Sequence, residues 1–268
     1  MKTVLLAGCG KMGTAMLSGW LERLDEDLRF VVVDPALDAD HPLAGHDRVS
    51  MMASLADDQP APDMVVLAVK PQMMAEALPP LVAMSSPETV WLSIAAGISI
   101  DWLREAISPD AAIIRTMPNT PSAIGRGVTA MIAAETVPEA MQGLARRMLG
   151  VIGVVVDLDD EADMDAVTAV SGSGPAYVFL LREALEAAGV AAGLKPELAA
   201  TLAGETLIGA AALLDASDET ATQLRINVTS PGGTTQAALE VLMDDNGMYS
   251  LLKQAVMAAR DRSRALGN

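Results

Sequence analysis

Three glycines near the start of the chain have the spacing of a nucleotide-binding turn. Gly8, Gly10 and Gly13 form the pattern G-x-G-x-x-G, directly after an apolar run and before a helix-forming stretch. The first glycine of this pattern permits a tight turn, the second lets the backbone approach a pyrophosphate, and the third lets helix and strand pack closely. Free N–H groups at the helix start then favour a phosphate. The spacing predicts a dinucleotide site, with a structural glycine turn as the alternative.

An acidic residue stands where the ribose of such a dinucleotide would lie. Asp34 closes the apolar run 30–33, and it follows Gly13 by about 20 residues. A carboxylate at this place accepts hydrogen bonds from the adenosine ribose and repels a 2′-phosphate. The next basic residue is Arg48. The pattern favours NADH over NADPH, and the alternative is that Asp34 only caps a turn before Pro35.

The chain has one cysteine and two histidines. Cys9 lies inside the glycine-rich turn, where we expect a small filler facing the nucleotide and no chemistry. The alternative is a thiolate stabilised by the nearby helix start. A single cysteine excludes an intrachain disulfide and a cysteine metal cluster, and two histidines argue against a histidine-rich zinc site. No metal site is therefore expected.

Three more loops follow apolar runs in the first half. Val69-Lys70-Pro71 ends one run, residues 93–97 end another in small side chains, and residues 115–121 carry two prolines and Asn119. Doubly wound sheets bind ligands at the carboxyl ends of their strands. Each loop alone could be an ordinary turn, but three on one rim favour a ligand. For Lys70, contact with a phosphate or packing along a ring is favoured over a role as catalytic acid.

The second half holds two more loops with polar and small residues. Residues 170–177 (VSGSGPAY) introduce one helix, and residues 229–235 (TSPGGTT) introduce another. Adjacent glycines beside hydroxyls form a cluster of N–H and O–H donors, which suits a small carboxylate without any cation. The alternative is an elaborate helix cap.

These loops can lie close together only if strands and helices hold them at one edge of a sheet. Unbroken aliphatic runs predict parallel strands covered on both faces, at residues 3–7, 30–33, 64–69, 90–95, 112–115, 129–133 and 151–158. Helix-forming stretches lie between them, at residues 14–24, 73–81 and 100–106. This alternation predicts an α/β Rossmann domain with a doubly wound, mostly parallel sheet over residues 1–158.

Residues 159–268 are expected to form an all-α domain. The acidic stretch 160–165 suits a helix start, and residues 176–216 are rich in helix formers. Residues 198–214 are apolar on nearly every face, and such a helix must be buried on all sides. About 110 residues can hardly surround it, so we infer a partner subunit, with a plain internal core helix as the alternative. An amphipathic helix over 249–266 closes the domain.

Charge and composition exclude several classes of protein. The 268 residues carry 18 Lys+Arg against 35 Asp+Glu, a net charge of −17, with only 3 Trp, 2 Tyr and 2 Phe. Such acidity argues against nucleic acid and anionic membranes, and few aromatics argue against base stacking. No 18 consecutive residues are apolar and the first residues do not resemble a signal peptide, so no membrane span and a cytoplasmic location are expected.

Six motifs together resemble the pyrroline-5-carboxylate reductases over essentially the whole chain. They are GCGKMGTAM, AVKPQ, SIAAGIS, RTMPNTP, VSGSGPAYVF and TSPGGTT, in this order. The resemblance implies reduction of L-1-pyrroline-5-carboxylate to L-proline with NADPH or NADH, the last step of proline biosynthesis. It also implies a homodimer with intertwined helical domains, often assembled further into a decamer, a pentamer of dimers. Many relatives carry a basic or hydroxyl residue where this chain has Asp34, which puts the usual NADPH preference in doubt.

The resemblance also implies the roles of single residues. Those that would contact the cofactor are Gly8, Cys9, Gly10, Lys11, Met12, Gly13, Asp34, Ala68, Val69, Lys70, Pro71, Ala95, Ala96, Gly97, Met117, Pro118 and Asn119. Those that would hold the substrate are Ser230, Gly232, Gly233, Thr234 and Thr235.

The substrate motifs contain no His, Glu or Asp. The protein's contribution is therefore expected to be orientation and donor placement, with the Thr235 hydroxyl donating to the ring nitrogen. Lys70 is the second candidate catalytic residue.

Two rival classes of protein fit the sequence less well than this resemblance. A β-hydroxyacid-type dehydrogenase would need a lysine that residues 175–194 lack. A silent dinucleotide sensor would not need residues 230–235.

Overall fold

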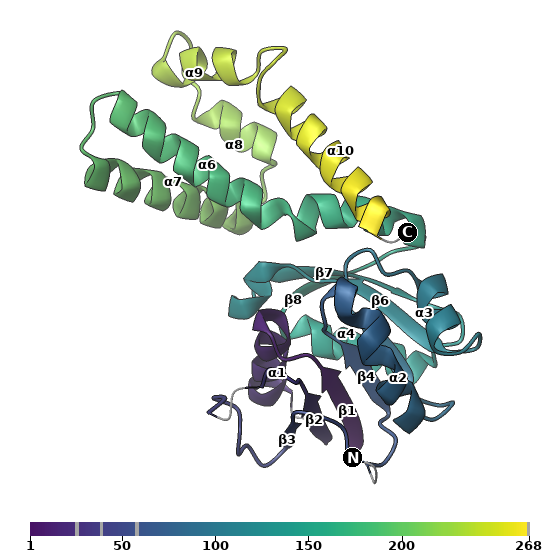
Figure 1. Ribbon diagram of the computed structural model, residues 1–268. Coiled ribbons are helices and arrows are strands. Elements are labelled where there is room, and N and C mark those ends of the chain that lie inside the picture. The colour runs from purple at the N-terminus through teal and green to yellow at the C-terminus, as the bar shows by residue number, and fades with distance from the viewer. Residues whose placement is uncertain (25–26, 38–39, 57–58, 267–268) are drawn as a thin grey trace. The chain divides into compact units, whose positions relative to one another are not determined.

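The computed structural model describes residues 1–24, 27–37, 40–56 and 59–266. The chain divides into two compact units, Met1–Ser173 with Ala259–Asn268, and Gly174–Ala258 (Figure 1). Each unit is described by itself. Residues 159–173 pack with the first unit, whereas the functional division at 158/159 stays a prediction.

The first unit is built on one eight-stranded sheet with the order β3-β2-β1-β4-β5-β6-β7-β8. The strands β1 to β6 run parallel, β7 runs antiparallel to β6, and β8 runs parallel to β7. The predicted doubly wound, mostly parallel sheet is therefore confirmed. The strands are β1 (Lys2–Ala7), β2 (Leu28–Val33), β3 (Val49–Met52), β4 (Met64–Leu67), β5 (Val90–Ser93), β6 (Ala112–Met117), β7 (Gly127–Ala133) and β8 (Gly153–Asp157).

The helices of this unit connect and cover the strands. They are α1 (Lys11–Arg23), α2 (Met74–Met84), α3 (Ile100–Ala106), α4 (Glu139–Gly150) and the short α5 (Met164–Val167). In the core, Trp20 of α1 stacks on Phe30 of β2 with ring centroids 5.4 Å apart, and its indole N–H donates to the Met148 carbonyl at 2.9 Å. The strand β4 is buried throughout, as its unbroken aliphatic run requires.

Two elements lie outside the sequence prediction. The strand β3 is a short edge strand with no fully buried residue, so its side chains give no aliphatic run to recognise. The helix α4 is strongly amphipathic and was not among the predicted helices. Strands β4 and β5 also end two residues earlier than predicted, at Leu67 and Ser93. The residues that follow them are free to form loops at the edge of the sheet.

The second unit contains α6 (Gly174–Ala191), α7 (Pro196–Ala216), α8 (Ala221–Asn227), α9 (Thr234–Leu242) and most of α10 (Met248–Leu266) (Figure 1). The chain crosses from α6 to α7 through Gly193, which has a φ of 101° that few other residues tolerate. The helices α6 and α7 pack on each other, with Gly189 close to Ala199.

The helix α7 is exposed over most of its length. Its buried residues are Ala199 and Ala203, whereas Ile208 is 65% exposed. An internal core helix is therefore wrong for this chain, and the exposed face calls for a further partner. By length and composition alone α7 could also cross a membrane, but only 11% of its most apolar window is buried inside the chain. Sufficient length and an apolar composition are by themselves weak evidence for a membrane span.

Candidate functional site

Three predicted glycines form a tight turn between β1 and α1. Gly8 has a φ of 94°, and a Cβ there would lie 2.7 Å from the Ala68 carbonyl oxygen. A Cβ on Gly13 would overlap the Gly8 carbonyl oxygen, whereas one on Gly10 would meet nothing within 4 Å. Gly8 and Gly13 are thus needed for packing, and Gly10 leaves open space beside the helix start. This is the geometry that a pyrophosphate requires.

The Asp34 carboxylate ties the end of β2 to this turn. One oxygen accepts the Cys9 N–H at 2.7 Å, and the other accepts the Ala36 N–H at 2.8 Å. Asp34 therefore does cap a turn. A carboxylate that accepts two hydrogen bonds still has free lone pairs, so Asp34 can also accept one from a ribose hydroxyl. Arg48 donates to carbonyls near the C-terminal end of α1, those of Leu21 at 2.6 Å and Leu24 at 3.1 Å. Its guanidinium is held away from the helix start.

Cys9 is buried beside two polar side chains. Its sulfur lies 3.6 Å from the Thr14 hydroxyl and 3.7 Å from His41 Nε2. Burial raises the pKa of the Cys9 thiol, the hydrogen bond with Thr14 opposes this, and the Asp34 charge raises it further. Stabilisation of the thiolate is therefore wrong for this residue. The proximity of His41 was missed, because the loop that carries it has no periodic signal.

Lys70 follows β4 at the same edge of the sheet. It is exposed, its backbone is extended at the start of a short 3₁₀ turn that begins with Pro71, and its side chain makes no hydrogen bond or ion pair with the described residues. The Ala68 N–H donates to the Ala7 carbonyl at 2.8 Å, which holds this loop against the glycine-rich turn. A flexible ammonium group is thus available to an anionic ligand.

The loops after β5 and β6 are fastened to each other. The Thr116 hydroxyl donates to the Ser93 carbonyl at 3.0 Å, and Gly97 has a φ of 80°. Asn119 uses its amide in both directions: its oxygen accepts the Val128 N–H at 3.0 Å and its nitrogen donates to the Ser171 carbonyl at 3.1 Å. The Asn119 side chain is therefore engaged within the protein, and contact with a ligand would come from its backbone.

These loops lie at one edge because their strands are parallel and in register. Ala7 pairs with Val33 and with Leu67, and Leu67 pairs with Ser93. The structure therefore brings to one edge the segments that carry all the predicted cofactor residues, namely Gly8 to Gly13, Asp34, Ala68 to Pro71, Ala95 to Gly97 and Met117 to Asn119. Such an edge is where doubly wound sheets hold nucleotides.

The predicted anion-binding loop belongs to the second unit. Gly232 has a φ of 69°, the Gly233 N–H donates to the Ser230 carbonyl at 3.0 Å, and no side chain caps α9 at Gly233. The alternative of an elaborate helix cap stays open, because the Gln236 side chain of α9 reaches back to this loop. The hydroxyls of Ser230, Thr234 and Thr235 make no hydrogen bond with the described residues.

A second backbone N–H of the anion-binding loop is engaged as well. The Gly232 N–H donates to the side-chain oxygen of Gln236 at 2.7 Å. This amide oxygen occupies a place that a carboxylate oxygen could take.

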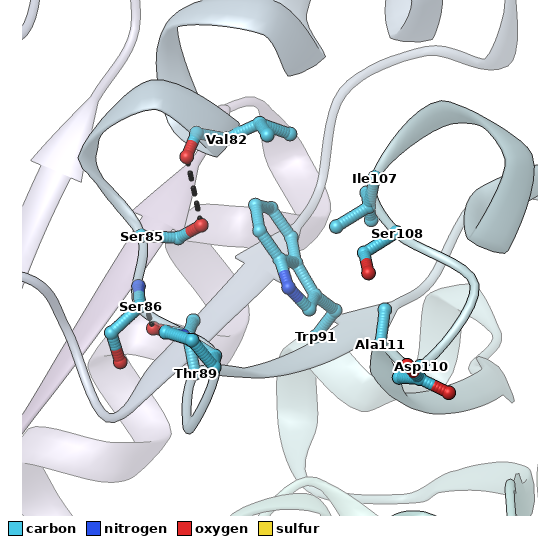
Figure 2. Close-up of a pocket in the computed structure, with 10 residues that line it drawn as sticks. Val82, Ser85, Ser86, Thr89, Trp91, Ile107, Ser108, Asp110 and Ala111 are labelled. Atoms are coloured by element: carbon cyan, nitrogen blue, oxygen red, sulfur yellow. Dashed lines mark hydrogen bonds between the residues drawn. The ribbon is translucent and has the colours of Figure 1, made fainter.

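A pocket of about 300 Å³ lies elsewhere in the first unit, beside Trp91 near the amino end of β5 (Figure 2). Two of its hydroxyls form hydrogen bonds within the protein. The Ser85 hydroxyl donates to the Val82 carbonyl at 2.9 Å, and the Thr89 hydroxyl accepts the Ser86 N–H at 3.0 Å. We assign it no ligand. Among the described residues no group of three or more His, Cys, Asp or Glu side chains could hold a metal ion.

Comparison with known proteins adds two family matches. Residues 161–266 match the model of pyrroline-5-carboxylate reductase dimerisation, and residues 2–97 match that of coenzyme F420-dependent NADP oxidoreductases. A pyrroline-5-carboxylate reductase from Pseudomonas aeruginosa is 37% identical over 98% of this chain and 96% of its own length.

Two solved structures agree over the full length. A pyrroline-5-carboxylate reductase from Coxiella burnetii has a TM-score of 0.90 and 32% identity, covering 100% of this chain and 99% of its own. The Plasmodium falciparum pyrroline carboxylate reductase, solved with NADP bound, has a TM-score of 0.84 and 28% identity, covering 100% and 98%.

Proposed function

This chain belongs to the pyrroline-5-carboxylate reductase family, and we propose that it carries out the family's reaction with NADH as the preferred hydride donor. In that reaction L-1-pyrroline-5-carboxylate becomes L-proline, the last step of proline biosynthesis. The observation that carries this proposal is a pair of sites in the structure. A cofactor edge follows β1, β2, β4, β5 and β6, and a loop with three hydroxyls that make no hydrogen bond to the described residues leads into α9.

The cofactor edge would hold a nicotinamide dinucleotide. The open space at Gly10 and the free N–H groups at the start of α1 fit its pyrophosphate, and the Asp34 carboxylate fits its adenosine ribose. Lys70 would meet a phosphate or pack along the nicotinamide ring. Small residues from Ala95 to Gly97, with the backbone of Met117 to Asn119, would flank that ring. When bound, the nicotinamide supplies a hydride to the imine carbon.

The residues before α9 would hold the substrate. Hydroxyls of Ser230 and Thr234, with N–H groups of Gly232 and Gly233, suit the carboxylate because they donate without adding a charge. The amide oxygen of Gln236 would leave the Gly232 N–H when the carboxylate arrives. The Thr235 hydroxyl would donate to the ring nitrogen, because an imine that accepts a hydrogen bond or a proton is a better hydride acceptor.

Preference for NADH rests on the surroundings of Asp34. A 2′-phosphate would face a carboxylate, and Arg48, the first basic residue after it in the sequence, is held at the far end of α1. Replacing Asp34 by Ser removes the repulsion and is expected to raise kcat/KM for NADPH relative to NADH. Preference for NADPH in the unchanged protein would contradict the role of Asp34 and leave the reaction itself untouched.

We also propose a homodimer formed through the exposed apolar faces of the helical unit. Its support is the match of residues 161–266 to a dimerisation model and the exposure of α7. Further assembly into a pentamer of dimers and a cytoplasmic location are parts of the same proposal.

The experiment is a direct assay of the whole chain. Pyrroline-5-carboxylate is mixed with NADH or with NADPH, and the loss of nicotinamide absorbance is followed while proline is measured as product. Absence of oxidation with both nucleotides would overturn the proposed function.

A further inference from the structure

A partly buried ion pair joins β6, whose carboxyl end belongs to the cofactor edge, to the segment after β8. Arg115, at the carboxyl end of β6, is 6% exposed, and its guanidinium donates to Glu161 Oε1 at 2.6 Å. The same oxygen accepts the Ile100 N–H at 2.9 Å. Glu161 therefore joins the end of a strand to the first residue of α3. It lies in a 3₁₀ turn (Glu161–Asp163) that belongs to neither element.

Both partners of Glu161 border loops of the cofactor edge. Ile100 follows the loop after β5, whose other end is held where Ser93 accepts the Thr116 hydroxyl. Arg115 immediately precedes Thr116 in β6. A carboxylate that bridges the guanidinium and the helix start thus joins the far end of the loop after β5 to the strand that leads into the loop after β6. Hydrogen bonds to a charged acceptor are the strong ones.

The chain that follows Glu161 makes two more contacts with the loop after β6. The Ser171 carbonyl accepts the Asn119 amide at 3.1 Å. A Cβ on Gly172 would lie 2.6 Å from the Met117 terminal methyl, so Gly172 and the end of the Met117 side chain pack closely. These residues form a π-helical turn (Thr168–Gly172), a geometry that often marks functional sites. Residues 161–172 therefore act as a strap across the back of the ring-flanking loops.

We propose that Glu161 is a positioning residue for hydride transfer. It holds α3 and β6 in the register that keeps the nicotinamide loops closed on the ring, and it touches neither substrate nor cofactor itself. The part of the test that measures kcat rests on the proposed function. The part that measures ligand binding needs only that the protein binds a dinucleotide.

The test compares Glu161→Ala with the unchanged protein. Because a shift of about 1 Å in a reacting group lowers rates by roughly 10²-fold, kcat is expected to fall at least about tenfold. NADH binding, followed by nicotinamide fluorescence, is expected to weaken. Binding of ADP-ribose, which lacks the nicotinamide, is expected to stay within about twofold, since Glu161 makes no hydrogen bond with Gly8 to Gly13 or with Asp34.

A conservative variant and a matched control separate positioning from folding. Glu161→Gln keeps an oxygen for the Ile100 N–H and is expected to restore most of the activity. Asp63→Ala is the matched control: Asp63 also accepts a backbone N–H, that of Thr3 at 2.7 Å, and pairs with Lys2, but at the amino end of β4. It is expected to leave kcat unchanged.

Removal of Glu161 leaves Arg115 buried without its partner, which destabilises the fold. The double variant Glu161→Ala with Arg115→Met removes that charge and still lacks the acceptor for Ile100, so its kcat is expected to stay low. Two results would overturn the proposal: kcat of a folded Glu161→Ala protein equal to that of the control, or ADP-ribose binding lost to the same extent as NADH binding. An unchanged protein that binds NADH but reduces no imine would overturn only the proposed function.

Discussion

At the scale of single residues, Thr235 carries the chemical part of the proposal. It lies in the first turn of α9, and its hydroxyl has no hydrogen bond to the described residues. The loop before it offers neutral donors and no carboxylic acid or imidazole. A hydroxyl that donates to the ring nitrogen is therefore the group whose removal should affect the chemical step most directly.

Replacing Thr235 by Ala is expected to lower kcat/KM by roughly 10²-fold, the scale of a general acid–base group. Steady-state kinetics with pyrroline-5-carboxylate measures this, and Thr235→Ser, which keeps the hydroxyl, is the control. An alanine variant with full activity would show that another group assists the ring nitrogen.

Lys70 presents a choice between binding and acid catalysis. Its side chain is exposed and unengaged by the described residues, so nothing in the fold orients it as a proton donor. We expect Lys70→Met to raise KM for the nucleotide and to leave kcat nearly unchanged, because binding is lost equally in ground and transition states. A collapse of kcat at saturating nucleotide would instead assign it to proton transfer.

At the scale of elements, the turn from β1 to α1 separates two uses of glycine. A Cβ at Gly13 would overlap the backbone of the turn, whereas one at Gly10 has open space. Gly13→Ala is therefore expected to lower Tm. Gly10→Ala is expected to keep Tm and weaken NADH binding, because the added methyl group fills the place of the pyrophosphate. Thermal denaturation and fluorescence titration of both variants check this, and equal Tm losses would refute it.

At the scale of elements, part of the candidate site could be predicted from the sequence and part could not. The glycine turn, Asp34 and the strand-end loops were predictable because each follows an unbroken aliphatic run, and parallel strands bring their carboxyl ends together. Glu161 was not predictable as a partner of Arg115. In sequence it is one acid in a stretch that suits a helix start, and its two partners precede it by 46 and 61 residues. The edge strand β3 lacked any pattern because half-exposed positions impose none.

At the scale of the whole molecule, the helical unit cannot bury its own apolar surface. Ile208 of α7 is 65% exposed, and many leucines around it are exposed as well. Ile208→Glu is expected to shift the protein from dimer to monomer in sedimentation experiments, because a charge inside an apolar interface loses its hydration. Val154→Glu, the same change at a 65% exposed position of β8, is the control. A dimer that survives Ile208→Glu would place the interface on other helices.

The net charge of −17 sets a second expectation for the whole molecule. Both the dinucleotide and the substrate are anions, so the overall field of the protein opposes their binding. Donors at the helix starts act within the Debye length of about 8 Å at physiological salt. Added salt screens the repulsion and is expected to lower Kd for NADH modestly in titrations at constant pH. Weaker binding with salt would reveal a basic funnel instead.

The first unit is discontinuous, and this has a consequence for how the protein is made. The Ser263 hydroxyl donates to Asp165 at 2.7 Å, across 98 residues of sequence, and Arg264 pairs with the same carboxylate. During synthesis the N-terminal segments of a chain leave the ribosome, and can begin to fold, before the C-terminal ones. The strap after Glu161 must therefore wait for α10 before its outer side is covered. Nascent chains that end before α10 would show a nucleotide-binding sheet whose strap is still open to proteases.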